Sequence, residues 1–125
     1  MSEPGSMLEF RFFYFTAHYD ACVAFYRDGL DLAIVRSWDR GPADRGTIFR
    51  APNGGGMIEI ESGEDGPPSH AGFYIQVDDV RAWYERARQR GLSVSGEPAV
   101  TSYGHLNFWI TDPAGFRIGV FQYAT

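Results

Sequence analysis

The sequence of 125 residues contains a single cysteine, Cys22, so no disulfide bond can form within one chain. Cys22 falls on the apolar stripe of a predicted helix, which favours a small buried hydrophobic residue over a nucleophile. No stretch approaches the roughly 20 apolar residues that span a bilayer, and the N-terminal residues form no signal-peptide pattern. These absences favour a cytoplasmic protein without a membrane partner.

Positive charge is also scarce, with 11 Lys and Arg residues against 16 Asp and Glu residues and a net charge of −5. Nucleic acids and anionic membranes are bound through clustered basic faces. One predicted helix does gather four arginines, but Glu85 lies among them, and the pattern is typical of a solvated helix face. We therefore expect no nucleic acid as a partner.

What the chain does contain is an internal repeat with a period near 60 residues. The segment Asp20–Tyr26 is echoed by Asp78–Tyr84, and Ala51–Gly54 is echoed by Asp112–Gly115. Two copies of this length are too few and too long for a solenoid. The repeat predicts a single domain over residues 1–125 made of two similar modules, at 7–62 and 70–123, with any chemistry placed between them.

Each module is predicted to have the order βαβββ. In the first, a strand at 8–15 precedes a helix at 20–28 that Asp20 caps and Gly29 ends, and strands follow at 32–38, 46–50 and 57–61. In the second, a strand at 71–77 precedes a helix that Asp78 or Asp79 caps and that runs to about 90. Strands follow at 92–95 or 92–100, at 106–111 and at 116–123. The Gly- and Pro-rich segment 62–69 is the expected linker. The predicted fold class is α+β, with two cupped mixed sheets that each carry one helix on the outer face.

Strand alternation predicts which face of each sheet could hold a ligand. Ile58 and Ile60 form the apolar side that packs on the helix, which leaves Glu59 on the opposite face. The same argument places Gly119 on that face in the second module. The candidate ligand-binding residues there are Arg11, Phe13, Trp38 (in a nearby loop), Phe49, Glu59, Tyr74, Tyr103, Trp109, Arg117 and Phe121. Aromatic walls with a few fixed charges suit an aromatic or extended organic ligand, and ordinary core packing is the alternative explanation.

Four segments resemble the vicinal oxygen chelate superfamily, also called the glyoxalase/bleomycin resistance protein/dioxygenase group. They are Ala24–Leu30, Ile58–Ile60, Val77–Val80 and Asp112–Ile118. The resemblance extends from about Leu8 to Gln122 and implies paired βαβββ modules and a homodimer. It also implies that metal-dependent members hold a divalent ion through side chains of the first, fourth, fifth and eighth strands.

The four matching positions in this chain are about Arg11, Glu59, Gly72 and Gly119, and only Glu59 can bind a cation. The leading hypothesis is therefore a metal-free, non-catalytic protein of the bleomycin-resistance-like branch, with no cofactor, that sequesters a small organic molecule. A salt bridge between Arg11 and Glu59 would be compatible only with a site that binds no metal ion.

Two alternatives stay open. The first is a divalent-metal-dependent lyase, isomerase or dioxygenase with a shifted ligand set of Glu59, His70 and either His18 or His105. The second is a degenerate duplicate whose cleft is filled by its own side chains and which acts only through protein contacts.

Overall fold

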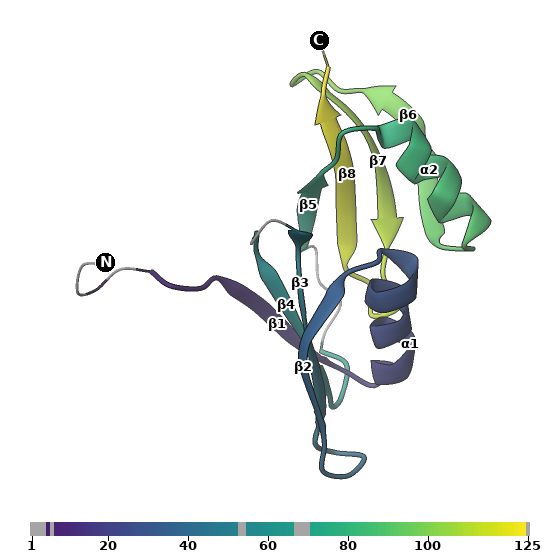
Figure 1. Cartoon of the computed structure of the whole chain (residues 1–125). Helices are drawn as coiled ribbons and strands as arrows, with labels where there is room; N and C mark the ends of the chain where they lie inside the picture. The colour runs from purple at the N-terminus through teal and green to yellow at the C-terminus, as the bar shows by residue number, and fades with distance from the viewer. Residues whose placement is uncertain (1–4, 6, 53–54, 67–70, 125) are drawn as a thin grey trace. The chain divides into compact units, whose positions relative to one another are not determined.

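The computed structural model of the chain describes residues 5, 7–52, 55–66 and 71–124 (Figure 1). It divides into two compact units, Met1–Asp65 and Gly66–Thr125, and the boundary falls within the segment 62–69. The first unit contains β1 (Arg11–Thr16), α1 (Tyr19–Ala24), the π-helix η1 (Phe25–Gly29), β2 (Ala33–Asp39), β3 (Arg45–Arg50) and β4 (Met57–Ser62). The second contains β5 (Gly72–Gln76), α2 (Val80–Gln89), β6 (Ser93–Val100), β7 (His105–Thr111) and β8 (Arg117–Tyr123). The predicted α+β class with two tandem βαβββ units is confirmed.

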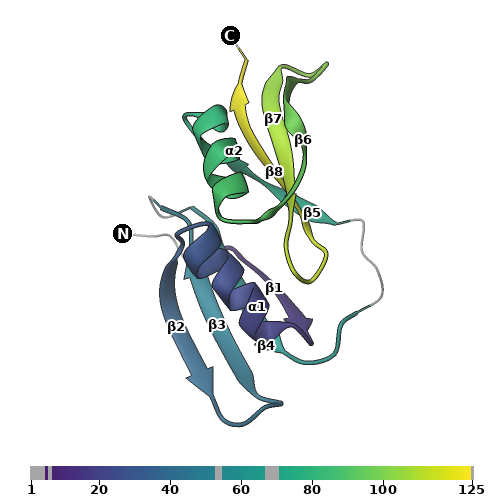
Figure 2. The ribbon, with the colours of Figure 1, turned by 90° about the vertical axis from the view of Figure 1, so that its right-hand side faces the viewer.

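The first unit is a four-stranded mixed sheet with the order β1-β4-β3-β2, in which β1 and β4 are parallel and the other neighbours are antiparallel. Its helix lies across one face of the sheet (Figure 2). The predicted apolar stripe of Cys22, Phe25 and Tyr26 is buried there, and the Tyr26 ring lies 5.9 Å from that of Phe49. We call the opposite face of each sheet its open face.

Both ends of the first helix differ from the prediction. The residue before the helix is His18, and it makes no side-chain capping bond. Asp20 lies inside the helix, where its carboxylate accepts a bond of 2.9 Å from Arg45 instead of capping the helix. At the other end the chain widens into a π-turn, since the N–H of Leu30 bonds to the carbonyl of Phe25 at 3.0 Å. The left-handed backbone that ends this segment is at Asp31, with φ of 59°, and not at Gly29.

The second unit repeats the topology with the order β5-β8-β7-β6. Here the helix ends match the prediction. The carboxylate of Asp79 caps α2 by accepting the N–H of Ala82 at 3.1 Å, and Gly91 follows the helix with φ of 70°. The helix packs on the sheet through buried Val80 and through Tyr84, whose ring is 5.4 Å from Phe108. Within the described residues no helix is long and apolar enough to cross a bilayer.

The outer strands of the two sheets are not equally regular. β2 has a register shift between Ile34 and Arg36, and β6 has one between Ser95 and Ala99. β6 also contains a proline at position 98. By contrast, β1 and β5, at the other edges, pair with their neighbours in continuous register.

Candidate functional site

An ion pair joins β1 to β4 on the open face of the first sheet. Nη1 of Arg11 donates to Oε1 of Glu59 at 2.6 Å, and the other terminal nitrogen bonds Glu9. The Glu59 side chain is only 14% exposed, against 34% for that of Arg11. A guanidinium therefore stands beside the one carboxylate that the sequence places at a metal-ligand position. The ion pair between Arg11 and Glu59 that the sequence suggested is therefore present.

A second carboxyl, Glu61, lies next to this pair on the same strand face. Partial burial and then hydrogen bonding to Glu59 raise the pKa of Glu61, and the charge of Asp44 acts in the same direction. The neighbour of Glu61 on β3 is Gly46, and the Trp38 ring lies so close over this glycine that a Cβ there would overlap it. Trp38, which the sequence placed in a nearby loop, thus belongs to β2 and covers the open face.

Phe49 does not lie on the open face, and its expected position is wrong. It pairs with Ile58, is fully buried and packs on the helix side of the sheet. Ile48 is the residue of this strand that pairs with Glu59. Thr47, Ile48 and Phe49 are all buried, so β3 is covered on both of its faces. Such a strand shows no alternation of polar and apolar residues, and the sequence cannot tell which side chains point toward the helix.

The open face of the second sheet carries an aromatic cluster, which we define as Tyr74, Tyr103, His105, Trp109, Phe121 and Tyr123. The Tyr74 ring lies 5.5 Å from Trp109 and 5.8 Å from Phe121. Hydrogen bonding to Tyr103 raises the pKa of Tyr74. The guanidinium of Arg117 sits over Trp109, 4.3 Å from the ring centroid. The structure therefore brings together all five residues predicted for this module.

Two members of the cluster, His105 and Tyr123, were not among the predicted ligand-binding residues, and His105 was considered only as a metal ligand. His105 stacks on Phe121 with 4.1 Å between ring centroids and an angle of 15°, and its ring lies 5.3 Å from that of Tyr123. Both share strand parity with residues already predicted, since His105 lies four positions before Trp109 and Tyr123 two after Phe121. Extending the period-two count to the strand ends would have found them. Nδ1 of His105 is buried and has no hydrogen-bond partner among the described residues.

The glycines of this face lie where side chains cannot easily be placed. At Gly119 a Cβ would be 2.6 Å from the Tyr74 ring and 3.1 Å from the Trp109 ring. At Gly72 a Cβ would overlap the carbonyl oxygen of Arg117, its neighbour on β8. A side chain at 119 requires the rings to move, and one at 72 requires the backbone to move. Neither position can present a metal ligand with the strands as they stand.

The other candidate metal ligands are His18, His70 and His105. Nε2 of His18 is 3.2 Å from Asp65, whose carboxylate also accepts bonds of 3.0 Å from Thr16 and the Ala17 N–H. His70 lies outside the described residues. Across residues 5, 7–52, 55–66 and 71–124, no group of three His, Cys, Asp or Glu residues could hold a metal ion.

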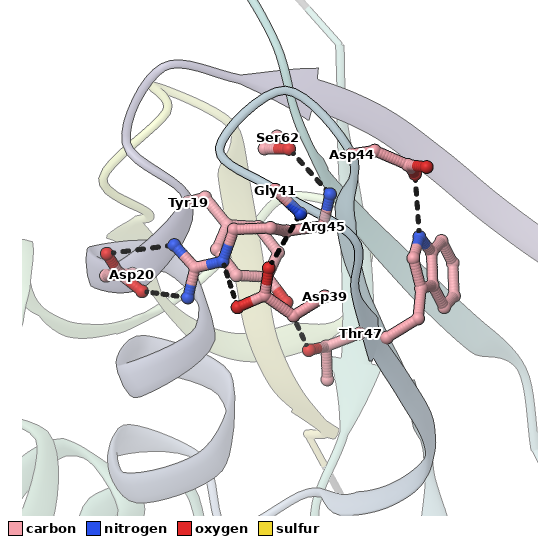
Figure 3. A network of polar contacts seen from close by, with 9 residues as sticks. Tyr19, Asp20, Asp39, Gly41, Asp44, Arg45, Thr47 and Ser62 are labelled. Atoms are coloured by element: carbon pink, nitrogen blue, oxygen red, sulfur yellow. Dashed lines mark hydrogen bonds and ion pairs between the residues drawn. The ribbon is translucent and has the colours of Figure 1, made fainter.

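A polar network joins the first helix to the β2–β3 hairpin on the helix side of the first sheet (Figure 3). Arg45 binds Asp20 and lies 3.4 Å from Asp39, with its guanidinium 4.5 Å from the Tyr19 ring centroid. The hydroxyl of Tyr19 hydrogen-bonds that of Thr47 at 2.6 Å. A groove of about 390 Å³ lies beside this network. Two carboxylates face the single guanidinium, so the network fastens the helix to the hairpin and carries one negative charge in excess.

The sequence profile described as "Glyoxalase/Bleomycin resistance protein/Dioxygenase superfamily" matches residues 10–120. The chain belongs to this superfamily. No curated protein sequence matches the chain.

Several solved structures share the fold at low sequence identity. A superfamily member from Sphaerobacter thermophilus is 17% identical, covers 94% of this chain and 98% of its own, and has a TM-score of 0.76. TnmS3, an antibiotic binding protein from Streptomyces sp. CB03234, is 23% identical over 98% of this chain and 100% of its own, with a TM-score of 0.75. Lactoylglutathione lyase from Agrobacterium tumefaciens is 21% identical over 96% and 95%, with a TM-score of 0.70. Binding proteins and enzymes are therefore both similar to this chain.

Proposed function

We propose that this superfamily member is a cytoplasmic protein that binds a small organic molecule without a metal and without converting it. One observation carries the proposal: the positions that match the family's metal ligands cannot supply a ligand set. Arg11 holds Glu59, Gly72 abuts the backbone of β8, and Gly119 lies beneath two aromatic rings. A cation at Glu59 would have to displace a guanidinium and would find no second donor at the two glycines.

The aromatic cluster supplies the binding surface in this proposal. Tyr74 and Tyr103 are 52% and 59% exposed, so flat apolar area is available to a ligand. Stacking on such rings suits a planar aromatic molecule, and the guanidinium of Arg117 over Trp109 offers a hydrogen-bond donor for a carbonyl or carboxylate at its edge. The antibiotic binding protein TnmS3 has the same fold, so the fold is compatible with this use.

Calorimetric titration with two aromatic antibiotics, bleomycin and daunorubicin, tests the binding surface. We expect at least one of them to bind with micromolar affinity. Trp109→Ala should weaken binding about tenfold, because one aromatic contact contributes about 0.5–1.5 kcal/mol beyond its buried area. Trp83→Ala is the matched control, since Trp83 lies on α2 and packs against Arg86. Unchanged affinity of the Trp109 variant would show that the ligand binds elsewhere.

Metal analysis tests the other half of the proposal. Protein purified without chelators is expected to contain far less than one equivalent of zinc, nickel, manganese or iron by mass spectrometry. Supplementing the growth medium with these metals should not change the result. A stoichiometric metal that survives dialysis would overturn the metal-independent assignment, although the fold would be unaffected.

A second candidate function is a metal-dependent lyase with a shifted ligand set. The buried Nδ1 of His105, which has no partner among the described residues, favours it because an unpaired imidazole nitrogen can bind a metal. This function predicts that the methylglyoxal–glutathione hemithioacetal is consumed when Zn²⁺ or Ni²⁺ is added. Glu59→Gln and His70→Ala should each abolish turnover and metal retention. No consumption with any added metal would eliminate this candidate.

A homodimer is also part of the proposal. The resemblance to the superfamily implies one, and large apolar side chains such as Leu8, Phe10 and Phe13 are exposed in the single chain.

A further inference from the structure

A polar side chain, that of Asn107, is buried on the open face of the second sheet. Asn107 is 6% exposed, and its Nδ2 has no hydrogen-bond partner among the described residues. It lies on β7 two positions after His105 and two before Trp109, so its side chain shares their face of the strand. The carboxamide therefore lies on the same face as the aromatic cluster.

An unpaired buried amide destabilises a folded protein, because its hydrogen bonds to water are lost and not replaced. The buried hydroxyl of Thr47 shows the usual arrangement, since it bonds the hydroxyl of Tyr19 at 2.6 Å. On β7, Nδ1 of His105 is also buried and unpaired within the part of the chain that the structure describes. Two such nitrogens at successive positions of one strand face, about 6–7 Å apart along the strand, indicate a place where a bound molecule supplies the missing partner.

The neighbouring strands leave one side of Asn107 open. On β8 it pairs with Phe121, whose ring belongs to the aromatic cluster. On β6 it pairs with Ala99, while Trp109 pairs with Ser95, and both of these β6 residues are small and exposed. The register of β6 shifts between them, which bends the strand locally. A planar molecule can therefore approach the amide from the β6 side and rest against rings on the β8 side.

The chemistry of the amide nitrogen restricts what such a molecule carries. Nδ2 has two N–H donors and no acceptor, so its complement is an oxygen with free lone pairs. A carboxylate does not suit the buried position, because removing its charge from water costs more than one amide hydrogen bond returns. A neutral carbonyl oxygen does suit it. A charged group fits better near Arg117, whose guanidinium lies over the Trp109 ring.

We propose that Asn107 is a specificity-determining residue that selects aryl ketones, by donating a hydrogen bond from Nδ2 to the ketone oxygen. The inference rests on the proposed ligand-binding function and names the class of ligand. It also means that Asn107 lowers the stability of the ligand-free protein and is useful only when the ligand is bound.

Calorimetric titration with two matched planar acids tests the selection. Fluorenone carboxylate carries a ketone oxygen that fluorene carboxylate lacks, and the two share their ring frame and the position of the carboxylate. The unaltered protein should bind the ketone about tenfold more tightly, which is the effect of one hydrogen bond to a buried amide. Asn107→Leu removes the polar atoms at similar volume and should bind the two acids equally. Asn107→Ala should do the same without adding bulk.

Thermal unfolding gives a second readout that needs no ligand. Asn107→Leu should melt at the temperature of the unaltered protein or up to about 5 °C above it, because an unpaired amide is removed. Thr47→Val is the matched control, since its buried hydroxyl has a partner. This control should melt lower than the unaltered protein and keep the preference for the ketone.

The possible failures of the inference and of the proposed function are distinguishable. Equal binding of the two acids to the unaltered protein, or a preference that survives in both Asn107 variants, would overturn the inference alone. A fall in Tm for Asn107→Leu as large as that for Thr47→Val would mean that the amide is already paired, and would overturn it too. Binding of bleomycin or daunorubicin without binding of either acid would contradict only the ligand class. If none of the four compounds binds, the proposed function fails and the inference fails with it.

Discussion

Alanine substitutions at three glycines test whether the second sheet can carry side chains at positions 72 and 119. In Gly72→Ala the new Cβ would overlap the carbonyl oxygen of Arg117 and lie 3.0 Å from the carbonyl carbon. In Gly119→Ala it would lie 2.6 Å from the Tyr74 ring. Gly56→Ala is the control, because nothing lies within 4 Å of its Cβ position. The three sites thus offer a backbone obstacle, a side-chain obstacle and open space.

The expected losses of stability follow from what must move. At Gly72 the obstacle is the adjacent strand, so relief requires β5 to separate from β8, and overpacking of this kind costs about 2–3 kcal/mol. At Gly119 the Tyr74 ring is 52% exposed and can swing outward, while replacing glycine in a strand gains about 0.5–1 kcal/mol. The net change there should stay within about 1 kcal/mol. At Gly56 nothing has to move, so only the stabilisation from replacing glycine is expected.

Urea and thermal unfolding followed by circular dichroism measure these differences. For a chain of this size, the Gly72→Ala loss corresponds to a fall in Tm of roughly 8–12 °C, and Gly56→Ala should melt at or slightly above the unaltered protein. If Gly72→Ala unfolds within about 0.5 kcal/mol of Gly56→Ala, the spacing between the strands adjusts freely. The steric reasoning against a ligating side chain at 72 would then fail, and the metal-independent proposal would lose its main support.

Three further predictions concern the face assignments and the pH dependence of stability. Phe49→Ala should lower the free energy of unfolding by about 3–5 kcal/mol, because Phe49 is fully buried. Phe13 is 59% exposed, so Phe13→Ala should lower it by less than about 1 kcal/mol. Similar losses for the two variants in urea titrations would contradict the corrected placement of Phe49. Because the pKa of Glu61 is raised in the folded protein, its stabilising contribution is complete below the unfolded pKa and is lost as the pH rises through the folded pKa. Glu61→Gln should therefore raise Tm near pH 8 by a few degrees and lose this advantage near pH 4, and a pH-independent difference would refute the assignment. The N–H of Ala17 chiefly lowers the pKa of Asp65, whose contribution is present above its unfolded pKa and lost as the pH falls through the folded pKa. Asp65→Asn should thus melt lower than the unaltered protein near pH 7 but equally near pH 2, and thermal scans at both values would expose any other pattern.

The sequence predicts the fold well because both units are encoded by local signals. Period-two strands, an apolar helix stripe and turn residues recur in the same order, and the cap at Asp79 and the stop at Gly91 both lie where expected. The errors come from distant partners. Asp20 has the residue type of a cap, but Arg45, 25 positions away, binds its carboxylate. No local pattern records such a contact.

The candidate site is predictable only where one face of a strand is polar or open. Glu59 between two buried isoleucines reveals its face, and the pairing with Arg11 follows from the parity of the first strand. Phe49 could not be assigned to a face in this way, because successive residues of β3 are buried whichever face they occupy. Only the pairing of Phe49 with Ile58 shows that it lies on the helix side. The raised pKa of Glu61 depends on burial and on two neighbouring carboxylates, which sequence spacing alone does not quantify.

The tight contact at Gly72 limits how the sequence of this surface can change during evolution. New rings or charges can accumulate one substitution at a time around Gly119, where the crowding groups are rotatable and partly solvated. A side chain at 72 would first need a compensating change in the neighbouring strand, and such ordered pairs of substitutions are seldom reached by single steps. Divergence among close descendants of this chain should therefore remodel the aromatic surface while leaving Gly72 in place.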